Sequence, residues 1–380
     1  MAHLLLILIL AVARLTQAQV EFKITTQDGA ANLQGQLDLP SRNCGPGPYP
    51  AVVFVSGTGF AYRDGLVNRP PMDERSFLYK YLASRFSRQC WLTVRWDYRG
   101  VYCDQRPGNE SKNCIDEILR GSMTYAKMLE DIESVYRYAS SHPLVKKEGL
   151  VVVGHSEGSI NVSRLIGQGR LRPKGLLFIG GITESPRAIF HWQVVVRPGT
   201  WLFELDRDQN QVVTNNEIEA GFSSSKLASL GYQASAFLSP SGSWTQGEYF
   251  AKAERDFAKY RRLELAKPDQ EPFRLAGRFV YSQQSYWKMW FLDNTSVLDH
   301  LQNYEGPVIF MNGDIDSQTP AARVHNFLRH YKKPLRSYPV VKVYKGIGHS
   351  FGRHPLLGPV EEVMASEIEK SIREILIRQP

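Results

Sequence analysis

The chain lacks an apolar run long enough to cross a bilayer. Its N-terminal apolar stretch, Leu4 to Ala13, is shorter than the roughly 20 residues that a membrane-spanning helix needs. Polar residues follow it, and Thr16-Gln17-Ala18 supplies the small residues that signal peptidase accepts. We therefore expect residues 1–18 to be a cleaved signal peptide, and the mature protein to be secreted without stable membrane insertion. An uncleaved anchor or a buried strand is the alternative.

Concentrated positive charge is also missing. The formal net charge is +8 over 380 residues, but the basic residues are scattered. Two local clusters, Lys259 to Arg262 and Arg329 to Lys333, are short and carry no recognition motif. We therefore expect a solvated basic surface and no nucleic-acid partner. The composition is that of a globular protein, no internal repeat is visible, and the length suits one large domain with an insertion, or two domains.

Cysteine is scarce, and its placement is informative. The chain has four cysteines, all in its first third: Cys44, Cys90, Cys103 and Cys114. An even number in an oxidising compartment indicates two disulfides. Cys103 with Cys114 would close a local loop and leave Cys44 with Cys90, while the other two connectivities remain open. The spacing of these residues matches no metal site.

Three glycosylation sequons occur, at Asn109, Asn161 and Asn294. Asn161 falls inside a predicted helix, which is a poor acceptor position. Asn109 and Asn294 are therefore the glycosylation candidates.

Strand-like and helix-like segments alternate along most of the chain. An antiparallel hairpin is predicted over residues 20–26 and 32–39. Apolar runs predict further strands at 51–55, 91–96, 150–153, 175–179, 307–311 and 340–344, and helical periodicity marks 75–86, 122–141 and 360–377. This order predicts an α/β fold with a mostly parallel central sheet covered by helices.

The alternation breaks between residues 182 and 306, where the sequence becomes aromatic, polar and helix-compatible. We predict a core formed by residues 19–181 and 307–380, with 182–306 as an inserted, mainly helical cap.

The strongest local motif is Gly154-His155-Ser156-Glu157-Gly158. It follows the apolar run Leu150 to Val153 and precedes a helix-compatible segment. A G-x-S-x-G turn between a strand and a helix can hold a strained serine with its hydroxyl above the sheet. The alternative is a glycine-rich turn of a nucleotide-binding sheet, in which Ser156 only caps the helix.

Two later strands also end in suggestive residues. Strand 307–311 runs into a loop with Asp314 and Asp316, and strand 340–344 runs into a loop with His349. Functional groups gather at the carboxyl ends of parallel strands. A serine hydroxyl needs a neutral imidazole to take its proton, and a carboxylate to orient that imidazole. The developing oxyanion needs amide donors, for which the backbone N–H groups of Glu157 and Thr58 are the simplest candidates.

With these motifs the chain resembles the α/β-hydrolases over nearly all of its mature length. The resemblance implies Ser156 as nucleophile, His349 as base and Asp316 as acid, with Gly313 as the glycine that precedes the acid. Asp314 is the rival acid, disfavoured by its spacing. One departure is Ser56-Gly57, where the family has His-Gly before the oxyanion loop. Glu157 after the serine is similar to esterase and dienelactone-hydrolase-like members, and a serine aminopeptidase-like branch is also compatible.

A second motif lies inside the predicted cap. Residues 206–217 resemble the loop of an EF-hand, in which oxygen ligands surround a Ca²⁺ ion. The ligand positions are filled by Asp206, Asp208, Asn210, the Val212 carbonyl, Thr214 and Glu217. Gln211 stands where the family has glycine, so a positive φ there would be strained. No second loop is visible, although such modules usually pair.

Together these features predict a secreted serine hydrolase. We expect it to cleave a small-molecule carboxylic ester through a Ser-His-Asp triad and an acyl-enzyme, with no cofactor for catalysis and with Ca²⁺ as a structural ion in the cap. A peptidase or aminopeptidase on the same fold is one alternative. A non-catalytic, calcium-dependent binding protein is the other.

Overall fold

The computed structural model describes residues 18–59, 62–67, 73–102, 115–275 and 279–378. The predicted signal peptide up to residue 17, Cys103, Cys114 and Asn109 lie outside these residues, so the structure does not test them. Across the described part of the chain, none of the helices combines the length and the hydropathy that crossing a bilayer requires.

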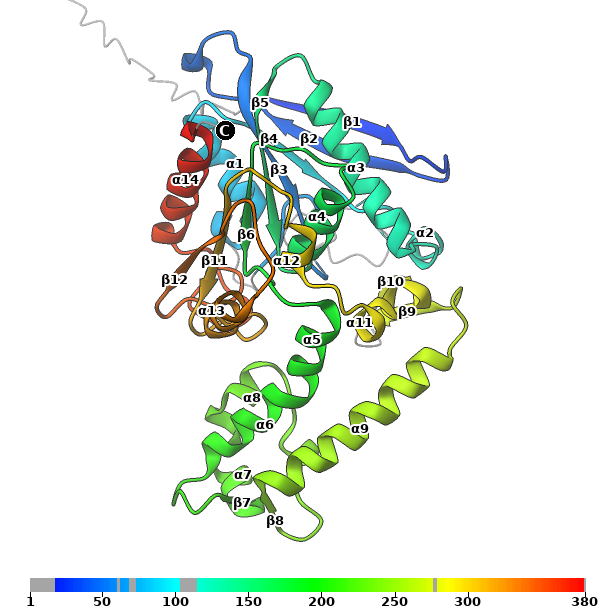
Figure 1. Cartoon of the computed structure of the whole chain (residues 1–380), viewed down its shortest axis with the longest axis vertical. Coiled ribbons are helices and arrows are strands. Elements are labelled where there is room, and N and C mark those ends of the chain that lie inside the picture. Colours follow the sequence, from blue (N-terminus) through cyan, green and yellow to red (C-terminus); the bar gives the residue numbers. More distant parts are fainter. Residues whose placement is uncertain (1–17, 60–61, 68–72, 103–114, 276–278, 379–380) are drawn as a thin grey trace, which may run out of the picture.

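An eight-stranded sheet forms the centre of the molecule (Figure 1). Its order is β1-β2-β4-β3-β5-β6-β11-β12. The first two strands pair antiparallel, as does β2 with β4, and all later neighbours are parallel. The strands are β1 (Gln19–Thr25), β2 (Asn32–Asp38), β3 (Tyr49–Val55), β4 (Leu92–Trp96), β5 (Val145–His155), β6 (Gly175–Ile179), β11 (Val308–Gly313) and β12 (Val340–Tyr344). The predicted hairpin and mostly parallel sheet are confirmed.

Helices cover both faces of this sheet, because its central strands are apolar on both sides. In β5, Leu150 and Val152 pack toward α3 (Tyr125–Ser141) and α4 (Glu157–Gly167). The alternate residues Val151 and Val153 pack toward α1 (Leu78–Arg88) and α14 (Glu362–Ile377). The period of two in a strand thus divides one apolar run between two cores.

The helix boundaries follow local capping residues. Thr124 accepts a hydrogen bond from the backbone N–H of Lys127, so α3 begins at Tyr125 rather than at residue 122. The segment predicted as a helix from residue 75 begins as a 3-10 turn at Glu74–Ser76, and α1 starts only at Leu78. Two further helices outside the insertion are α2 (Glu117–Gly121), which precedes α3, and α13 (Ala321–His330), which follows β11.

Between β6 and β11 the chain leaves the sheet, and we call residues 180–307 the insertion. Figure 1 shows its lower part, from α5 to α9, extending away from the sheet. None of its described strands joins the central sheet, and they form two separate two-stranded ribbons. Its elements are α5 (Pro186–His191), α6 (Arg197–Leu202), β7 (Val212–Thr214), α7 (Asn215–Gly221), α8 (Lys226–Ser229), β8 (Ser243–Thr245), α9 (Gln246–Ala266), β9 (Pro272–Leu275), β10 (Phe279–Gln283), α10 (Gln284–Trp287), α11 (Met289–Leu292) and α12 (Val297–His300).

One disulfide is described, between Cys44 and Cys90, with the two Cα atoms 5.4 Å apart. It ties the segment after β2 to the residue two places before β4. This pairing is the one expected if Cys103 and Cys114 pair with each other.

Candidate active site

Ser156 lies at the junction of β5 and α4 in a strained conformation. Its φ of 53° and ψ of −119° are unusual for a residue with a side chain. Its backbone N–H donates to the Ile179 carbonyl at 2.9 Å, which fastens the turn to β6. The Ser156 side chain makes no capping hydrogen bond to α4. The alternative in which this serine serves only as a helix cap is therefore not supported.

The glycines around Ser156 permit close backbone approach. A Cβ added at Gly57 would lie 2.7 Å from the Ser156 Cβ, and one at Gly158 would lie 2.3 Å from the Val55 carbonyl oxygen. Contacts this short require displacement of the backbone. Glycine at these positions therefore allows the end of β3 to lie against the turn.

His349 and Asp316 meet across the loops that follow β12 and β11. The His349 Nδ1 lies 2.9 Å from Asp316 Oδ2 and 3.0 Å from Oδ1. Both side chains are buried, with 3% exposure for each residue. Asp316 also accepts from the backbone N–H groups of Gln318 at 2.7 Å and Thr319 at 2.9 Å. Burial acts to raise the pKa of Asp316, but the neighbouring His349 and these donors bring it below its ordinary value.

Thr319 is a residue of this site to which the sequence assigned no role. Its hydroxyl lies 2.9 Å from both Asp316 Oδ2 and the Gly180 carbonyl oxygen. A single hydroxyl proton serves one of these acceptors at a time. The only sequence signal was the Thr319-Pro320 pair after the acid.

The His349 imidazole lies beside the serine turn. A Cβ added at Gly180, whose φ is +52°, would be 2.8 Å from His349 Nδ1. The ring of His155, the residue before the serine, has its centroid 5.0 Å from that of His349. No hydrogen bond joins the Ser156 hydroxyl to His349 within the described residues. Hydrogen bonds of catalytic groups are often long or poorly aligned without substrate and tighten when it binds.

Asp314, the rival acid, lies elsewhere. Its Oδ1 accepts from the backbone N–H of Gly346 at 2.7 Å, within the loop after β12. The carboxylate that contacts His349 is that of Asp316.

The two candidate oxyanion donors, Glu157 and Thr58, are adjacent. Glu157 is the first residue of α4, and Thr58 follows β3. The Thr58 hydroxyl donates a hydrogen bond to Glu157 Oε2, so the side chains join the two residues whose backbone N–H groups the sequence singled out.

The loop 206–217 brings its acidic residues together. Carboxylate oxygens of Asp206, Asp208 and Glu217 all lie within 4.8 Å of one another. Gln211 has a φ of +68°, the strained turn that its position required. Its backbone N–H donates to Asp206 Oδ2 at 2.8 Å. Asp206 Oδ1 is buried and has no hydrogen-bond partner among the described residues.

A second loop pairs with the first, although none was visible in the sequence. In the β7–β8 ribbon, Val213 lies opposite Trp244, and each is followed by a threonine that caps a helix with a glutamate three residues later. Gly242 has a positive φ of +91° at the position equivalent to Gln211. The second loop therefore repeats the geometry of the first. It carries Phe237, Ser239 and Ser241 where the first has Asp206, Asp208 and Asn210.

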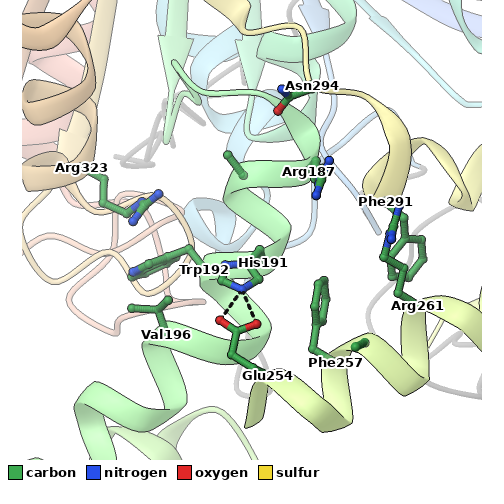
Figure 2. A pocket seen from close by; sticks show the side chains of 12 residues that line it. Arg187, His191, Trp192, Val196, Glu254, Phe257, Arg261, Phe291, Asn294 and Arg323 are labelled. Carbon is green, nitrogen blue, oxygen red and sulfur yellow. Dashed lines mark hydrogen bonds and ion pairs between the residues drawn. The ribbon is translucent and has the colours of Figure 1, made fainter. Parts of the chain in front are cut away.

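A hollow of about 690 Å³ lies over α5, and Figure 2 shows residues that line it. Ser156 and His349 are not among the residues that line it. One wall carries His191, whose Nε2 lies 2.9 Å from Glu254 of α9. Asn294, a glycosylation candidate, is exposed at its edge, whereas Asn161 is 1% exposed and inaccessible.

Comparison with known proteins finds similarity at the level of the fold. No protein-family model and no curated protein sequence matches this chain. Among solved structures, it is similar to Est1E from Butyrivibrio proteoclasticus, with 16% identity, a TM-score of 0.51, and 94% of this chain and 99% of that chain covered. A hypothetical protein from Pseudomonas aeruginosa matches with 13% identity, a TM-score of 0.51, and coverage of 95% and 94%. An alpha/beta hydrolase, GrgF from Penicillium sp., matches with 14% identity, a TM-score of 0.49, and coverage of 95% and 100%.

Proposed function

We propose that this chain, which has the α/β-hydrolase fold, is a serine hydrolase acting on carboxylic esters. One observation carries the proposal: a serine at positive φ on a strand-to-helix turn, beside a buried His349–Asp316 pair. These are the parts that nucleophilic acyl transfer needs, contributed by three segments far apart in the sequence.

In the proposed mechanism, Ser156 Oγ attacks the carbonyl carbon of the ester and its proton passes to His349 Nε2. Asp316 accepts from His349 Nδ1, which holds the required tautomer and stabilises the imidazolium. The ester C–O bond then breaks, and His349 returns the proton to the departing alcohol oxygen. A water molecule, deprotonated by the same imidazole, releases the acyl group from the serine.

The oxyanion of each tetrahedral intermediate needs fixed donors near Ser156. The backbone N–H groups of Glu157 and Thr58 fill this role in the proposal. Glu157 begins α4, so the partial positive charge of the helix N-terminus adds to its amide.

A small acyl substrate is supported by one structural neighbour. Est1E has been solved with ferulic acid bound, and its TM-score to this chain is 0.51. An ester of a small carboxylic acid is therefore our proposed substrate class.

Two further properties belong to the proposal. Secretion is supported by the Cys44–Cys90 disulfide, because such bonds persist in oxidising compartments. Calcium binding by loop 206–217 is supported by its three clustered carboxylates and the unpartnered Asp206 Oδ1, both of which suit a hard cation. Asp206, Asp208, Asn210, Val212, Thr214 and Glu217 would hold the ion, which would stiffen the insertion and take no part in catalysis.

The catalytic proposal is tested by hydrolysis of short p-nitrophenyl esters and by fluorophosphonate labelling. We expect Ser156→Ala to lose at least about a thousandfold in kcat, and Asp316→Asn about ten-thousandfold, because the imidazole loses its correct tautomer. Ser163→Ala is a matched control on the same helix, since the Ser163 hydroxyl has no hydrogen-bond partner among the described residues. Equal hydrolysis by wild type and Ser156→Ala would overturn the proposal.

A further inference from the structure

The side chain of Glu157 is surrounded by hydroxyl groups. The residue is 1% exposed. Its Oε2 accepts from Thr58 and, at 2.8 Å, from the Tyr281 hydroxyl, and its Oε1 accepts from Tyr286. Three donors on one carboxylate match the acceptor-only character of its ionised form. Three of its roughly four acceptor positions are thus occupied by these hydroxyl groups.

The two tyrosines remain donors at every pH at which the protein would work. Burial raises the pKa of Tyr281 and of Tyr286 well above the ordinary value, and the Glu157 charge adds to the effect. A buried guanidinium, that of Arg120, lies 5.4 Å from the Tyr281 ring centroid. The Arg120 guanidinium therefore places a positive charge over the face of the tyrosine whose hydroxyl donates to Glu157.

This network joins three parts of the molecule. Thr58 belongs to the loop after β3, Glu157 begins α4, and Tyr281 and Tyr286 come from β10 and α10 of the insertion. We propose that the Glu157 side chain is a positioning residue for the oxyanion hole. Through its hydrogen bond to Thr58, the carboxylate fixes the distance between the backbone amides of Thr58 and Glu157. Through its hydrogen bonds to Tyr281 and Tyr286, it attaches the insertion next to these two amides. The inference rests on the proposed function.

Thr58 provides the sharpest test, because its hydroxyl can be removed while its amide stays. We expect Thr58→Val to lower kcat about tenfold with KM changed less than twofold, since a misplaced oxyanion donor acts on the transition state. Thr58→Ser keeps the hydroxyl and is expected to restore kcat. Thr93→Val is the matched control, because the buried Thr93 hydroxyl has no partner among the described residues.

The contact between the insertion and Glu157 is tested by Tyr286→Phe, which removes the donating hydroxyl and keeps the aromatic ring. We expect a kcat loss of about threefold to tenfold, and a loss in the Thr58→Val/Tyr286→Phe double variant that is smaller than the product of the single losses, because both donors act through one carboxylate. Thermal midpoints identify any variant that fails to fold.

The outcomes are distinct. If hydrolysis depends on Ser156 but kcat is equal in the wild type and Thr58→Val, the positioning role alone is overturned. The same conclusion follows if Thr58→Ser or Thr93→Val loses as much kcat as Thr58→Val. Absence of Ser156-dependent hydrolysis in the wild type overturns the proposed function on which the role rests.

The hollow over α5 carries a second, independent inference. Three guanidinium groups from three elements line it, those of Arg187, Arg261 and Arg323 (Figure 2). Arg187 and Arg261 form no ion pair within the described residues, and the buried Nε of Arg261 has no hydrogen-bond partner there. The rings of Trp192, Phe257 and Phe291 also line the hollow. Its one lining carboxylate, Glu254, contacts His191, and Arg323 is ion-paired with Glu184, so the charges left unpaired among the described residues are those of Arg187 and Arg261.

Unpaired cationic groups next to apolar rings suit a ligand with both an anionic and a planar apolar part. We also propose that this hollow binds an aromatic carboxylate, separately from Ser156. Calorimetric titration with 1-naphthoate is expected to show one saturable site that is unchanged in Ser156→Ala. In the Arg187→Gln/Arg261→Gln variant, binding is expected to weaken at least tenfold.

Arg255→Gln is the matched control, because Arg255 is an exposed arginine of α9 that does not line the hollow. It should bind 1-naphthoate as the wild type does. Equal binding by the double variant, or equal binding of the neutral 1-naphthamide, would overturn this site. Inorganic phosphate is expected to compete weakly, because it lacks the apolar body.

Discussion

At the scale of single residues, the candidate site depends on groups that are held by burial. His155 is fully buried beside the serine, and its Nε2 lies 3.3 Å from the His349 carbonyl oxygen. Burial lowers the pKa of His155 to about 3. The ring is therefore neutral in the folded protein under all conditions in which an esterase would be assayed.

This burial predicts a pH-dependent stability. An unfolded histidine has a pKa near 6.5, so between pH 6.5 and about 3 the unfolded state binds the extra proton. Above pH 6.5 the neutral His155 leaves the free energy of unfolding unaffected by pH. Below pH 6.5 that free energy falls, by up to about 1.4 kcal/mol per pH unit. Urea unfolding between pH 5 and 8 should show a shallower acid slope in His155→Gln than in the wild type. Identical slopes would contradict the prediction.

At the scale of elements, the paired loops of the insertion form a small module. Leu202, Val213, Ile218 and Trp244 pack in an apolar cluster separate from the two cores of the sheet. The β7–β8 ribbon sits in this cluster and connects both loops to α7 and α9. Any ion held in the first loop would therefore stiffen the second loop and α9 as well.

This arrangement predicts a calcium response that depends on one loop only. Millimolar Ca²⁺ is expected to raise the midpoint of thermal unfolding, and a chelator to reverse it, because an ion bound only by the folded state stabilises it by mass action. Glu217→Gln should abolish the response.

Glu248→Gln is the matched control. Glu248 occupies the same capping position in the second loop, where Phe237 and Ser239 replace the carboxylates of Asp206 and Asp208. It should keep the calcium response. A midpoint that Ca²⁺ does not move in the wild type would remove the calcium proposal.

At the scale of the whole molecule, the Cys44–Cys90 disulfide closes a long segment of the sheet. The two residues are 46 positions apart, and the segment between them contains β3 and α1. Cross-linking reduces the conformational entropy of the unfolded chain, by about 4 kcal/mol for a loop of this length in the chain-entropy description.

We therefore expect a Cys44→Ala/Cys90→Ala variant to lose up to about 4 kcal/mol of unfolding free energy in urea titrations. Treating the wild type with reductant should shift its midpoint in the same direction. Unfolding curves that coincide with and without the disulfide would contradict the expectation.

The sequence by itself determined the α/β class, most strand positions and the Ser156 turn. These depend on local patterns, because apolar runs, glycine spacing and strand-end residues act over a few neighbouring positions. The resemblance to the α/β-hydrolases also favoured Asp316 over Asp314, and the structure places Asp316 against His349.

Only the tertiary structure decided what surrounds these groups. The Glu157 carboxylate meets Tyr281 and Tyr286, 124 and 129 residues away, and no local pattern predicts which hydroxyl reaches a given carboxylate. The partner of loop 206–217 was hidden for a related reason. Its first three ligand positions are replaced, and the likeness is preserved by backbone register, a positive φ and the capping pair Thr245 and Glu248. Contacts between residues far apart in the sequence depend on how the whole chain packs, and a local sequence pattern does not specify that packing.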